Sequence, residues 1–260
     1  MRLMLRTRLT CLCWLGLQAS AAAADLGIVM LHGKWDRPPT HVAALAQQLQ
    51  ADGHLVAQPV MPWSALREYD VPYPQALREI EAAAQQLRDQ GAKRIVVGGL
   101  SFGANAAIAY AASGRPVAAI FALSPGHAPD RGPFRKAVAD SVAKAQAMIT
   151  AGQGQTPASF DDVNQGRSKQ VRVTANAYWS YFDPEGLAAM GPQAAAIAPG
   201  LPIFMAVGTE DKVSTYAEDG IFKRAPAHSQ SLYLSVATDH NGVVTVAAEA
   251  LRAWLRALKP

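Results

Sequence analysis

Short apolar runs alternate along most of the chain with stretches in which apolar residues recur every three or four positions. The runs have the length of buried strands, and the longer stretches have the period of helices that bury one face. We expect strands over residues 26–31, 55–60, 95–97, 117–123, 202–207 and 231–236. We expect helices around residues 42–51, 77–90, 104–112, 134–150 and 243–258. The alternation predicts a three-layer α/β/α sandwich with a mostly parallel sheet.

Residues 130–200 do not follow this alternation of strand-like and helical segments. A helical stretch precedes a polar, glycine-rich passage, AGQGQTPASFDDVNQGRSKQ, and the aromatic sequence YWSYF follows. No internal repeat is visible, and 260 residues suit one α/β domain. We therefore expect a single domain over residues 25–260, in which residues 130–200 form a small cap-like insertion over the edge of the sheet.

The first 24 residues have the features of an export signal. Three arginines form a basic start, residues 9–17 an apolar core, and residues 22–24 a small-residue cleavage site. The apolar run is too short to span about 30 Å of hydrocarbon, so a retained membrane anchor is the weaker interpretation. We predict cleavage near Ala24 and an exported mature chain, periplasmic or secreted, that is not inserted in a membrane.

Removing that segment changes what composition and charge imply. Hydrophobic residues make up 50% of the chain and charged residues 17%, which fits a globular protein. The net charge falls from +4 to +1, since 21 basic and 20 acidic residues remain, and no basic cluster indicates a nucleic-acid partner. Cys11 and Cys13 are lost with the segment, so the mature chain has neither a disulfide nor a thiolate metal site.

The segment GGLSFGAN, residues 98–105, lies between an expected strand and an alanine-rich helix. A G-x-S-x-G pattern occurs by chance in about one chain of this length in ten, so the pattern alone is weak. Its position is the context that a nucleophilic serine needs, because a turn there exposes the hydroxyl and aims the amino end of the helix at it. Gly99 and Gly103 leave space for that turn. Ser101 is therefore the predicted nucleophile.

The sequence resembles the α/β-hydrolase family, on the strength of GLSFG, of LHG after the first strand, and of an acid and a histidine in order downstream. Within the family it is similar to the serine esterase and dienelactone-hydrolase-like branch. The resemblance covers essentially the whole mature chain. It implies a sheet of eight or slightly fewer strands, an insertion after the sixth-strand position, and a serine, an acid and a histidine on loops at strand ends.

His240 and Asp211 are the expected partners of Ser101, because a serine hydroxyl needs a base that an acid orients. His240 lies in ATDHNG after the last strand, like the family's last-loop histidine, and His127 is the alternative base. Asp211 lies four residues beyond a strand, in VGTEDKVS. Glu210, one register away, and Asp130, at a position that some members use, remain alternative acids, whereas Asp239 is interpreted as a turn residue.

By resemblance, the backbone N–H groups of Phe102 and Lys34 form the oxyanion hole, with Trp35 as a substitute for Lys34 in a longer loop. We expect the Lys34 side chain to point into solvent, with contact to an anionic substrate as the alternative. His32 is expected to brace this loop. The predicted substrate pocket contains His32, Trp35, His127, Trp63 and Trp179, and the aromatic residues are expected to form an apolar roof.

These residues predict a serine hydrolase that cleaves a carboxylic ester through an acyl-enzyme and needs no metal or organic cofactor. Thioesterase, lactonase and peptidase activities use the same machinery and remain alternatives. The rival from another class is a non-catalytic member of the fold that binds a ligand, and such a member is expected to have lost one of the three residues. The predicted partner is a small-molecule acyl substrate, and the oligomeric state is left open.

Overall fold

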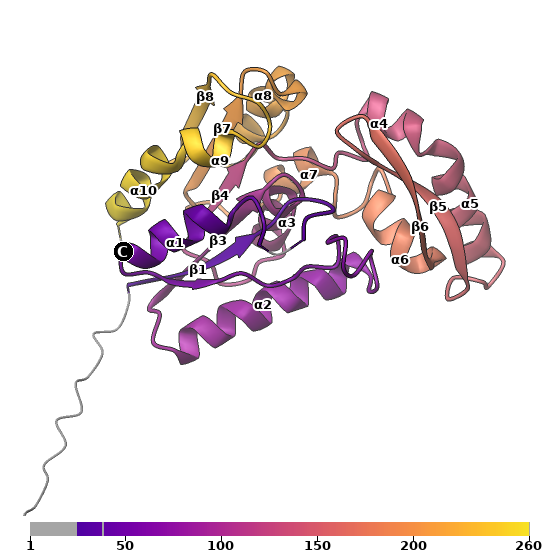
Figure 1. Cartoon of the computed structure of the whole chain (residues 1–260), viewed down its shortest axis with the longest axis horizontal. Coiled ribbons are helices and arrows are strands. Elements are labelled where there is room, and N and C mark those ends of the chain that lie inside the picture. The colour runs from indigo at the N-terminus through magenta and orange to yellow at the C-terminus, as the bar shows by residue number, and fades with distance from the viewer. Residues whose placement is uncertain (1–24, 38, 260) are drawn as a thin grey trace, which may run out of the picture.

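A six-stranded parallel sheet lies at the centre of the protein, whose computed structural model describes residues 25–37 and 39–259 (Figure 1). The predicted signal peptide lies outside these residues. The strand order is β2-β1-β3-β4-β7-β8, and every neighbouring pair is parallel. The strands are β1 (Leu26–Leu31), β2 (Leu55–Ala57), β3 (Arg94–Leu100), β4 (Ala119–Leu123), β7 (Ile203–Gly208) and β8 (Leu232–Val236). The predicted parallel sheet is confirmed.

Helices cover both faces of this sheet, as the alternating pattern predicted. Successive residues of β1 point to opposite faces, so Ile28 packs with helices on one side and Val29 with helices on the other. The first face carries α1 (Ala43–Ala51), α9 (Val243–Val246) and α10 (Ala248–Ala257), and the second carries α2 (Tyr73–Asp89), α3 (Phe102–Ala112) and α7 (Met190–Ala195). None of the helices in the described part of the chain has the length and apolarity that crossing a bilayer requires.

Residues 130–200 contain a compact group of elements that lies at one end of the molecule, to the right in Figure 1. These elements are α4 (Gly132–Ala137), α5 (Ala139–Thr150), β5 (Pro157–Asn164), β6 (Arg167–Thr174) and α6 (Ala175–Phe182), which we call the cap, and the short α7 leads back to the sheet. Phe160, Tyr178 and Phe182 stack in sequence inside the cap, which gives it an aromatic core. The remaining short elements, η1 (Lys212–Thr215), α8 (Ala217–Gly220) and η2 (Phe222–Arg224), lie between β7 and β8.

The cap contains an antiparallel hairpin, β5–β6, that the polar pattern of its sequence did not predict. Its turn is tight, because Gln165 and Gly166 both have positive φ, at 48° and 78°, as a two-residue type I′ turn requires. Phe160 and Val171 are paired and buried, but the next inward position of β5 is Asp162, which is also fully buried. The alternation of apolar residues that signals a strand is therefore broken by an acid on the core side.

Two strands, β2 and β3, differ most from their expected bounds. β2 ends at Ala57 rather than at residue 60, because Pro59 has no N–H to donate to a neighbouring strand. β3 continues through Gly98 and Gly99 to Leu100, although glycine normally weakens a strand. A Cβ at Gly99 would lie 2.1 Å from the carbonyl oxygen of Leu31 in β1. A Cβ at Gly98 would lie 2.3 Å from the Phe121 ring, so close packing against a backbone and a side chain explains the two glycines.

Gly103 in α3 lies against the same carbonyl, and its replacement is expected to destabilise the fold. A Cβ there would lie 2.4 Å from the oxygen of Leu31, which belongs to a central strand and cannot move aside. Gly103→Ala should lower the free energy of unfolding by about 1–3 kcal/mol, the usual cost of overpacking. The matched control is Gly132→Ala in α4, where nothing lies within 4 Å of the added Cβ. Equal denaturant midpoints for the two variants would contradict this explanation.

Candidate active site

Ser101 occupies the turn between β3 and α3 in a strained backbone conformation, with φ 57° and ψ −116°. Its N–H donates to the carbonyl of Leu123 at 2.9 Å, and its own carbonyl accepts from Gly126 at 3.0 Å. A Cβ at Gly126 would lie 2.7 Å from Ser101 Oγ, so this glycine leaves the hydroxyl accessible. The serine is thus held at the carboxyl end of the sheet, at the amino end of α3, by the end of β4 and the loop that follows it.

Strained residues gather around Ser101. Positive φ angles occur at Trp35 (62°), Ser124 (41°) and His127 (62°), which follow β1 and β4, the two strands on either side of β3. Such conformations cost on the order of 1–3 kcal/mol each and persist only where surrounding contacts enforce them. Asn105 supplies one such contact, because its amide donates to the carbonyl of His127 at 2.7 Å. Strain at three adjacent strand ends marks this edge of the sheet as the candidate active site.

His240 and Asp211 come together as the sequence predicted, although 29 positions separate them. The Nδ1–H of His240 donates to Asp211 Oδ2 at 2.5 Å, which leaves Nε2 as the basic nitrogen of the neutral ring. Burial acts to raise the pKa of Asp211, but the hydrogen bond and charge of His240 outweigh it and hold that pKa below its ordinary value. The carboxylate therefore stays ionised and orients the imidazole.

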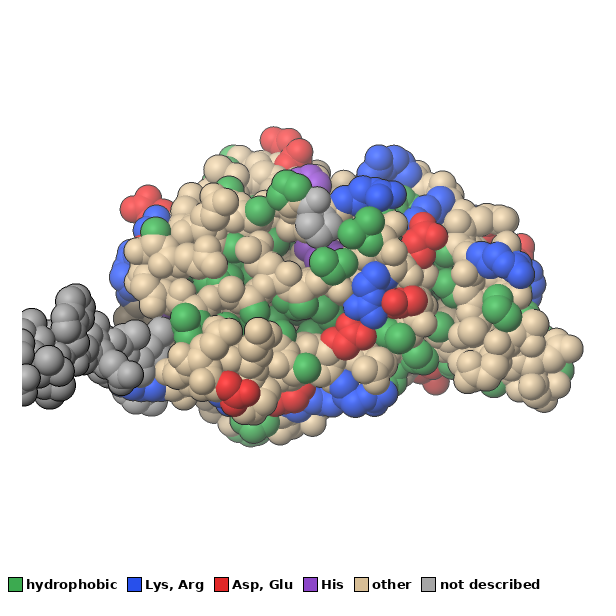
Figure 2. Space-filling view, turned by 60° about the horizontal axis from the view of Figure 1, so that its bottom comes forward, with side chains coloured by type: hydrophobic (Ala, Val, Ile, Leu, Met, Phe, Trp, Pro, Cys, Tyr) green, Lys and Arg blue, Asp and Glu red, His purple; other side chains and the backbone are tan. Residues whose placement is uncertain are grey.

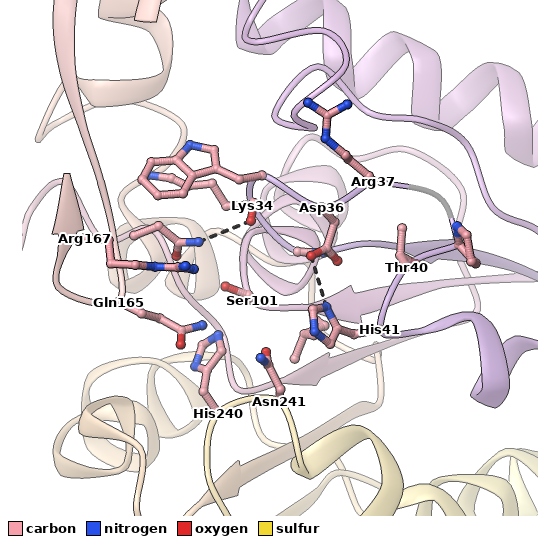
Figure 3. A pocket seen from close by; sticks show the side chains of 15 residues that line it. Lys34, Asp36, Arg37, Thr40, His41, Ser101, Gln165, Arg167, His240 and Asn241 are labelled. Atoms are coloured by element: carbon pink, nitrogen blue, oxygen red, sulfur yellow. Dashed lines mark hydrogen bonds and ion pairs between the residues drawn. The ribbon is translucent and has the colours of Figure 1, made fainter. Parts of the chain in front are cut away.

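His240 Nε2 is buried and finds no hydrogen-bond partner among the described residues. It is not hydrogen-bonded to Ser101 Oγ. His240 and Ser101 nevertheless line the same cavity, whose volume is about 490 Å³ (Figure 3). A buried nitrogen with a free lone pair therefore lines one cavity with a serine hydroxyl, which makes it the candidate base for that hydroxyl.

The other candidate acids do not bond to His240, and the alternative base, His127, does not line the cavity with Ser101. Asp239 accepts a hydrogen bond from the Gly242 N–H at 2.7 Å, as a turn residue does, and Glu210 is exposed. Asp130 is not bonded to His240, and burial raises its pKa. His127 Nε2 bonds to the carbonyl of Tyr181 at 2.7 Å, so neither ring nitrogen of His127 reaches the cavity.

Hydrogen bonds fix the loop after β1, and they leave the backbone N–H that was predicted for the oxyanion hole without an acceptor in the part of the chain that the structure describes. The N–H of Trp35 donates to the carbonyl of Trp63 at 2.9 Å and is therefore not available as the substitute donor. His32 Nδ1–H donates to the Gly33 carbonyl at 2.7 Å, and its Nε2 accepts from Met61 at 2.9 Å. His32 thus braces the loop. Neither Lys34 N–H nor Phe102 N–H has an acceptor within the described residues, which leaves both free for a ligand.

The Lys34 side chain does not point into solvent, contrary to the prediction. It turns inward, and its Nζ donates to the carboxylate of Asp162, to the carbonyl of Val163 at 2.7 Å and to His127 Nδ1 at 3.1 Å. Burial lowers the pKa of Lys34, and the charge of Asp162 opposes that effect. The acid that attracts the lysine lies in the hairpin that the sequence pattern did not reveal, so no local signal indicated this contact.

Asp162 is bonded on both carboxylate oxygens although it is fully buried. Besides Lys34, Trp35 Nε1 and the Tyr69 hydroxyl each donate to its Oδ2 at 2.7 Å. The next residues of the hairpin continue the contact, since Asn164 Nδ2 donates to the Lys34 carbonyl at 3.2 Å. The cap is therefore joined to the loop after β1 by a buried ion pair and by hydrogen bonds on both sides of it.

The predicted aromatic pocket is only partly formed. Trp35 lines the cavity, but His32, His127, Trp63 and Trp179 do not. Trp63 is fully buried, donates to the His32 carbonyl at 2.9 Å and stacks on Phe102, so it supports the loops from behind. Trp179 packs partly buried in the core of the cap. The cavity wall instead includes the polar hairpin residues Asn164, Gln165 and Arg167, which the sequence analysis missed.

No group of three or more His, Cys, Asp or Glu side chains able to hold a metal ion occurs among residues 25–37 and 39–259. The predicted independence from metals and cofactors stays a prediction.

Comparisons with known proteins agree on the fold. The family described as "Alpha/beta hydrolase family" matches residues 28–254. A structure from a study of LipS and LipT, two metagenome-derived lipolytic enzymes, shares 15% identity and a TM-score of 0.64, covering 91% of this chain and 95% of that one. The monoacylglycerol lipase of Paleococcus ferrophilus shares 16% identity and a TM-score of 0.62, covering 90% and 95%.

A thermostable carboxyl esterase from Bacillus coagulans shares 13% identity and a TM-score of 0.62, covering 89% of this chain and 90% of that one. At such identities the likeness shows the fold alone, and it does not assign the chain to the dienelactone-hydrolase-like branch. No curated protein matches the sequence.

The buried position of His127 predicts a pH dependence of stability. Burial, and then the charge of Lys34, hold the pKa of His127 well below its ordinary value of 6.5. The unfolded chain therefore binds a proton that the folded protein excludes as the pH falls below 6.5. The free energy of unfolding should fall in this range by about 1.4 kcal/mol per pH unit for this group, until the folded pKa is reached.

His127→Gln cannot take up that proton and should reduce the slope of unfolding free energy against pH by about one proton. Urea denaturation of both proteins between pH 7.5 and pH 5 measures the slopes. His32, whose pKa burial also lowers, contributes equally to both proteins. A slope unchanged by the substitution would show that His127 is not kept neutral by the fold.

Proposed function

The chain belongs to the alpha/beta hydrolase family, and from that premise we propose that it cleaves a carboxylic ester with Ser101 as the nucleophile, His240 as the base and Asp211 as the orienting acid. One observation carries this proposal. The unpartnered Nε2 of His240, whose ring Asp211 orients, shares a cavity with Ser101 on its strained turn.

The proposed reaction begins when Ser101 Oγ attacks the ester carbonyl and His240 Nε2 takes the hydroxyl proton. The carbon–oxygen bond to the alcohol then breaks, and His240 returns the proton to the departing oxygen, which leaves an acyl group on Ser101. Water, deprotonated by the same nitrogen, attacks this acyl-enzyme; the bond between the acyl carbon and Ser101 Oγ breaks, His240 returns the proton to Oγ, and the carboxylic acid is released. Throughout, Asp211 stabilises the imidazolium without accepting its proton.

We propose that the N–H groups of Lys34 and Phe102 bind the oxygen that becomes negative during each attack. Both lack an acceptor among the described residues, and both belong to residues whose side chains are fixed by packing. Phe102 stacks on the ring of His127 with a centroid distance of 4.0 Å, and Lys34 is held by Asp162. Preorganised donors of this kind lower the barrier, and loss of one costs about 3–4 kcal/mol.

Thioesters, lactones and peptides react by the same steps, so the chemistry of the site does not separate them from esters. The rival proposal of a non-catalytic binding protein requires the loss of a reacting group. It is disfavoured, because all three expected side chains are present and the histidine nitrogen that would accept the proton is free.

Ser101→Ala and Asp211→Asn are predicted to abolish or severely reduce ester hydrolysis. Without the hydroxyl no acyl-enzyme forms, and without the carboxylate His240 loses the tautomer that leaves Nε2 basic, which lowers kcat by about 10⁴-fold in a related triad. Steady-state hydrolysis of 4-nitrophenyl acetate and butyrate measures both effects. A fluorophosphonate probe followed by peptide mapping should label Ser101 in the wild type and not in Ser101→Ala.

Asp130→Asn is the matched control, because Asp130 is half-buried near the same edge of the sheet and is not bonded to His240. It should retain near-wild-type turnover. Full activity of Ser101→Ala would overturn the proposed function, and a loss confined to Asp130→Asn would move the acid to the loop after β4.

A further inference from the structure

The tip of the cap hairpin forms one wall of the cavity beside Ser101. Asn164, Gln165 and Arg167 line the cavity from this tip, and Asn164 is bonded to the Lys34 carbonyl. Arg167 is the first residue of β6 and is paired in register with Asn164 across the tight turn. The backbone of Arg167 is therefore fixed relative to the oxyanion loop rather than carried on a loose segment.

The cavity is mainly polar, unlike the pocket of an enzyme that binds long apolar acyl chains. Of its 15 lining residues, only Trp35, Pro39 and Leu100 have apolar side chains. The many aromatic residues of the cap pack against each other in its own core instead of opening onto the cavity. A polar acyl group suits this lining better than a fatty one.

Charges around the cavity leave a single basic group directed at the reacting serine. Figure 3 shows Arg167 pointing toward Ser101 and Arg37 pointing away from it. Lys34 is neutralised by Asp162, and Lys169, close to Arg167 on β6, is paired with Glu68 at 2.6 Å. No ion pair or hydrogen bond of the Arg167 side chain is found within the described part of the chain.

Asp36 is the one acid that lines the cavity, and its carboxylate already accepts two hydrogen bonds. Asp36 accepts hydrogen bonds from the N–H of Gly33 and from His41 Nδ1, both at 3.1 Å. Figure 2 shows Lys and Arg side chains close to the place where His side chains reach the surface, with Asp and Glu side chains among them. The cavity therefore offers an anion an unpaired guanidinium, and its one carboxylate, Asp36, is held by its own hydrogen bonds.

We propose that the substrate is an ester whose acyl chain ends in a carboxylate, and that Arg167 binds this carboxylate. The proposal rests on ester cleavage at Ser101. The alcohol must lie over His240, which returns its proton, and in Figure 3 Gln165 lies between Arg167 and His240, so the guanidinium is set apart from the leaving-group side. The planar guanidinium donates two parallel hydrogen bonds to a carboxylate, which gives both affinity and orientation.

The test compares half-esters of glutaric, adipic and suberic acid with 4-nitrophenol against neutral 4-nitrophenyl esters of the same acyl length. For at least one length the wild type should show a kcat/KM about tenfold higher for the half-ester, the factor expected from a charge-assisted hydrogen bond. Arg167→Gln should remove this preference mainly through KM, by slowing hydrolysis of the half-ester about tenfold more than that of the neutral ester. Arg172→Gln, an exposed arginine on the same strand outside the cavity, should keep the preference.

Equal or better hydrolysis of the neutral esters at every length would overturn the proposal, and so would an Arg167→Gln variant that slows both ester types by the same factor. Equilibrium binding to Ser101→Ala separates this proposal from the proposed function, because that variant cannot form an acyl-enzyme. Tighter binding of the half-ester there supports the Arg167 site even if the wild type hydrolyses neither ester. Equal binding of both esters refutes the site even if the wild type hydrolyses both.

Discussion

The buried ion pair between Lys34 and Asp162 is the contact on which the candidate active site depends. It joins the loop after β1 to a hairpin 128 positions away in sequence, and neither partner reaches solvent. Two buried charges are stable only when their remaining hydrogen-bonding capacity is satisfied, and here Trp35, Tyr69 and Val163 satisfy it. Separating the cap from the sheet would expose these charges to water or leave each of them buried without its partner. Cap and loop therefore behave as one unit rather than as a lid over a site.

This connection ties together the parts of the proposed mechanism. Lys34 provides one proposed oxyanion donor and, through its side chain, bonds to His127, whose ring stacks on Phe102, the other proposed donor. Strained backbone at Trp35, Ser101 and His127 is tolerable because these contacts enforce it. The cavity then lies between fixed walls, so the polar groups that it presents are in place before a substrate arrives, as electrostatic stabilisation of a transition state requires.

The sequence predicted those features of the fold and the site that depend on residues close together in the chain. Ser101 was identified by its glycines and by the strand and helix around it, and the pairing of Asp211 with His240 followed from loops at the ends of neighbouring strands. It did not reveal the hairpin, because Asp162 occupies an inward position where an apolar residue was expected. It also assigned Lys34 to solvent, and Trp63 and Trp179 to the pocket. Those placements are decided by a distant partner, and no spacing along the chain encodes it.

The most direct test is the affinity of a boronic acid that forms a tetrahedral adduct with Ser101. If the ion pair holds the oxyanion loop, Asp162→Asn should weaken this affinity by about a hundredfold, the usual cost of losing one donor. Asp161→Asn is the control, since that neighbouring carboxylate bonds to Ser141 at 3.0 Å, away from Lys34. Asp161→Asn should bind like the wild type. Equal affinity of the two folded variants for the boronic acid would contradict a role for the cap in positioning the oxyanion hole.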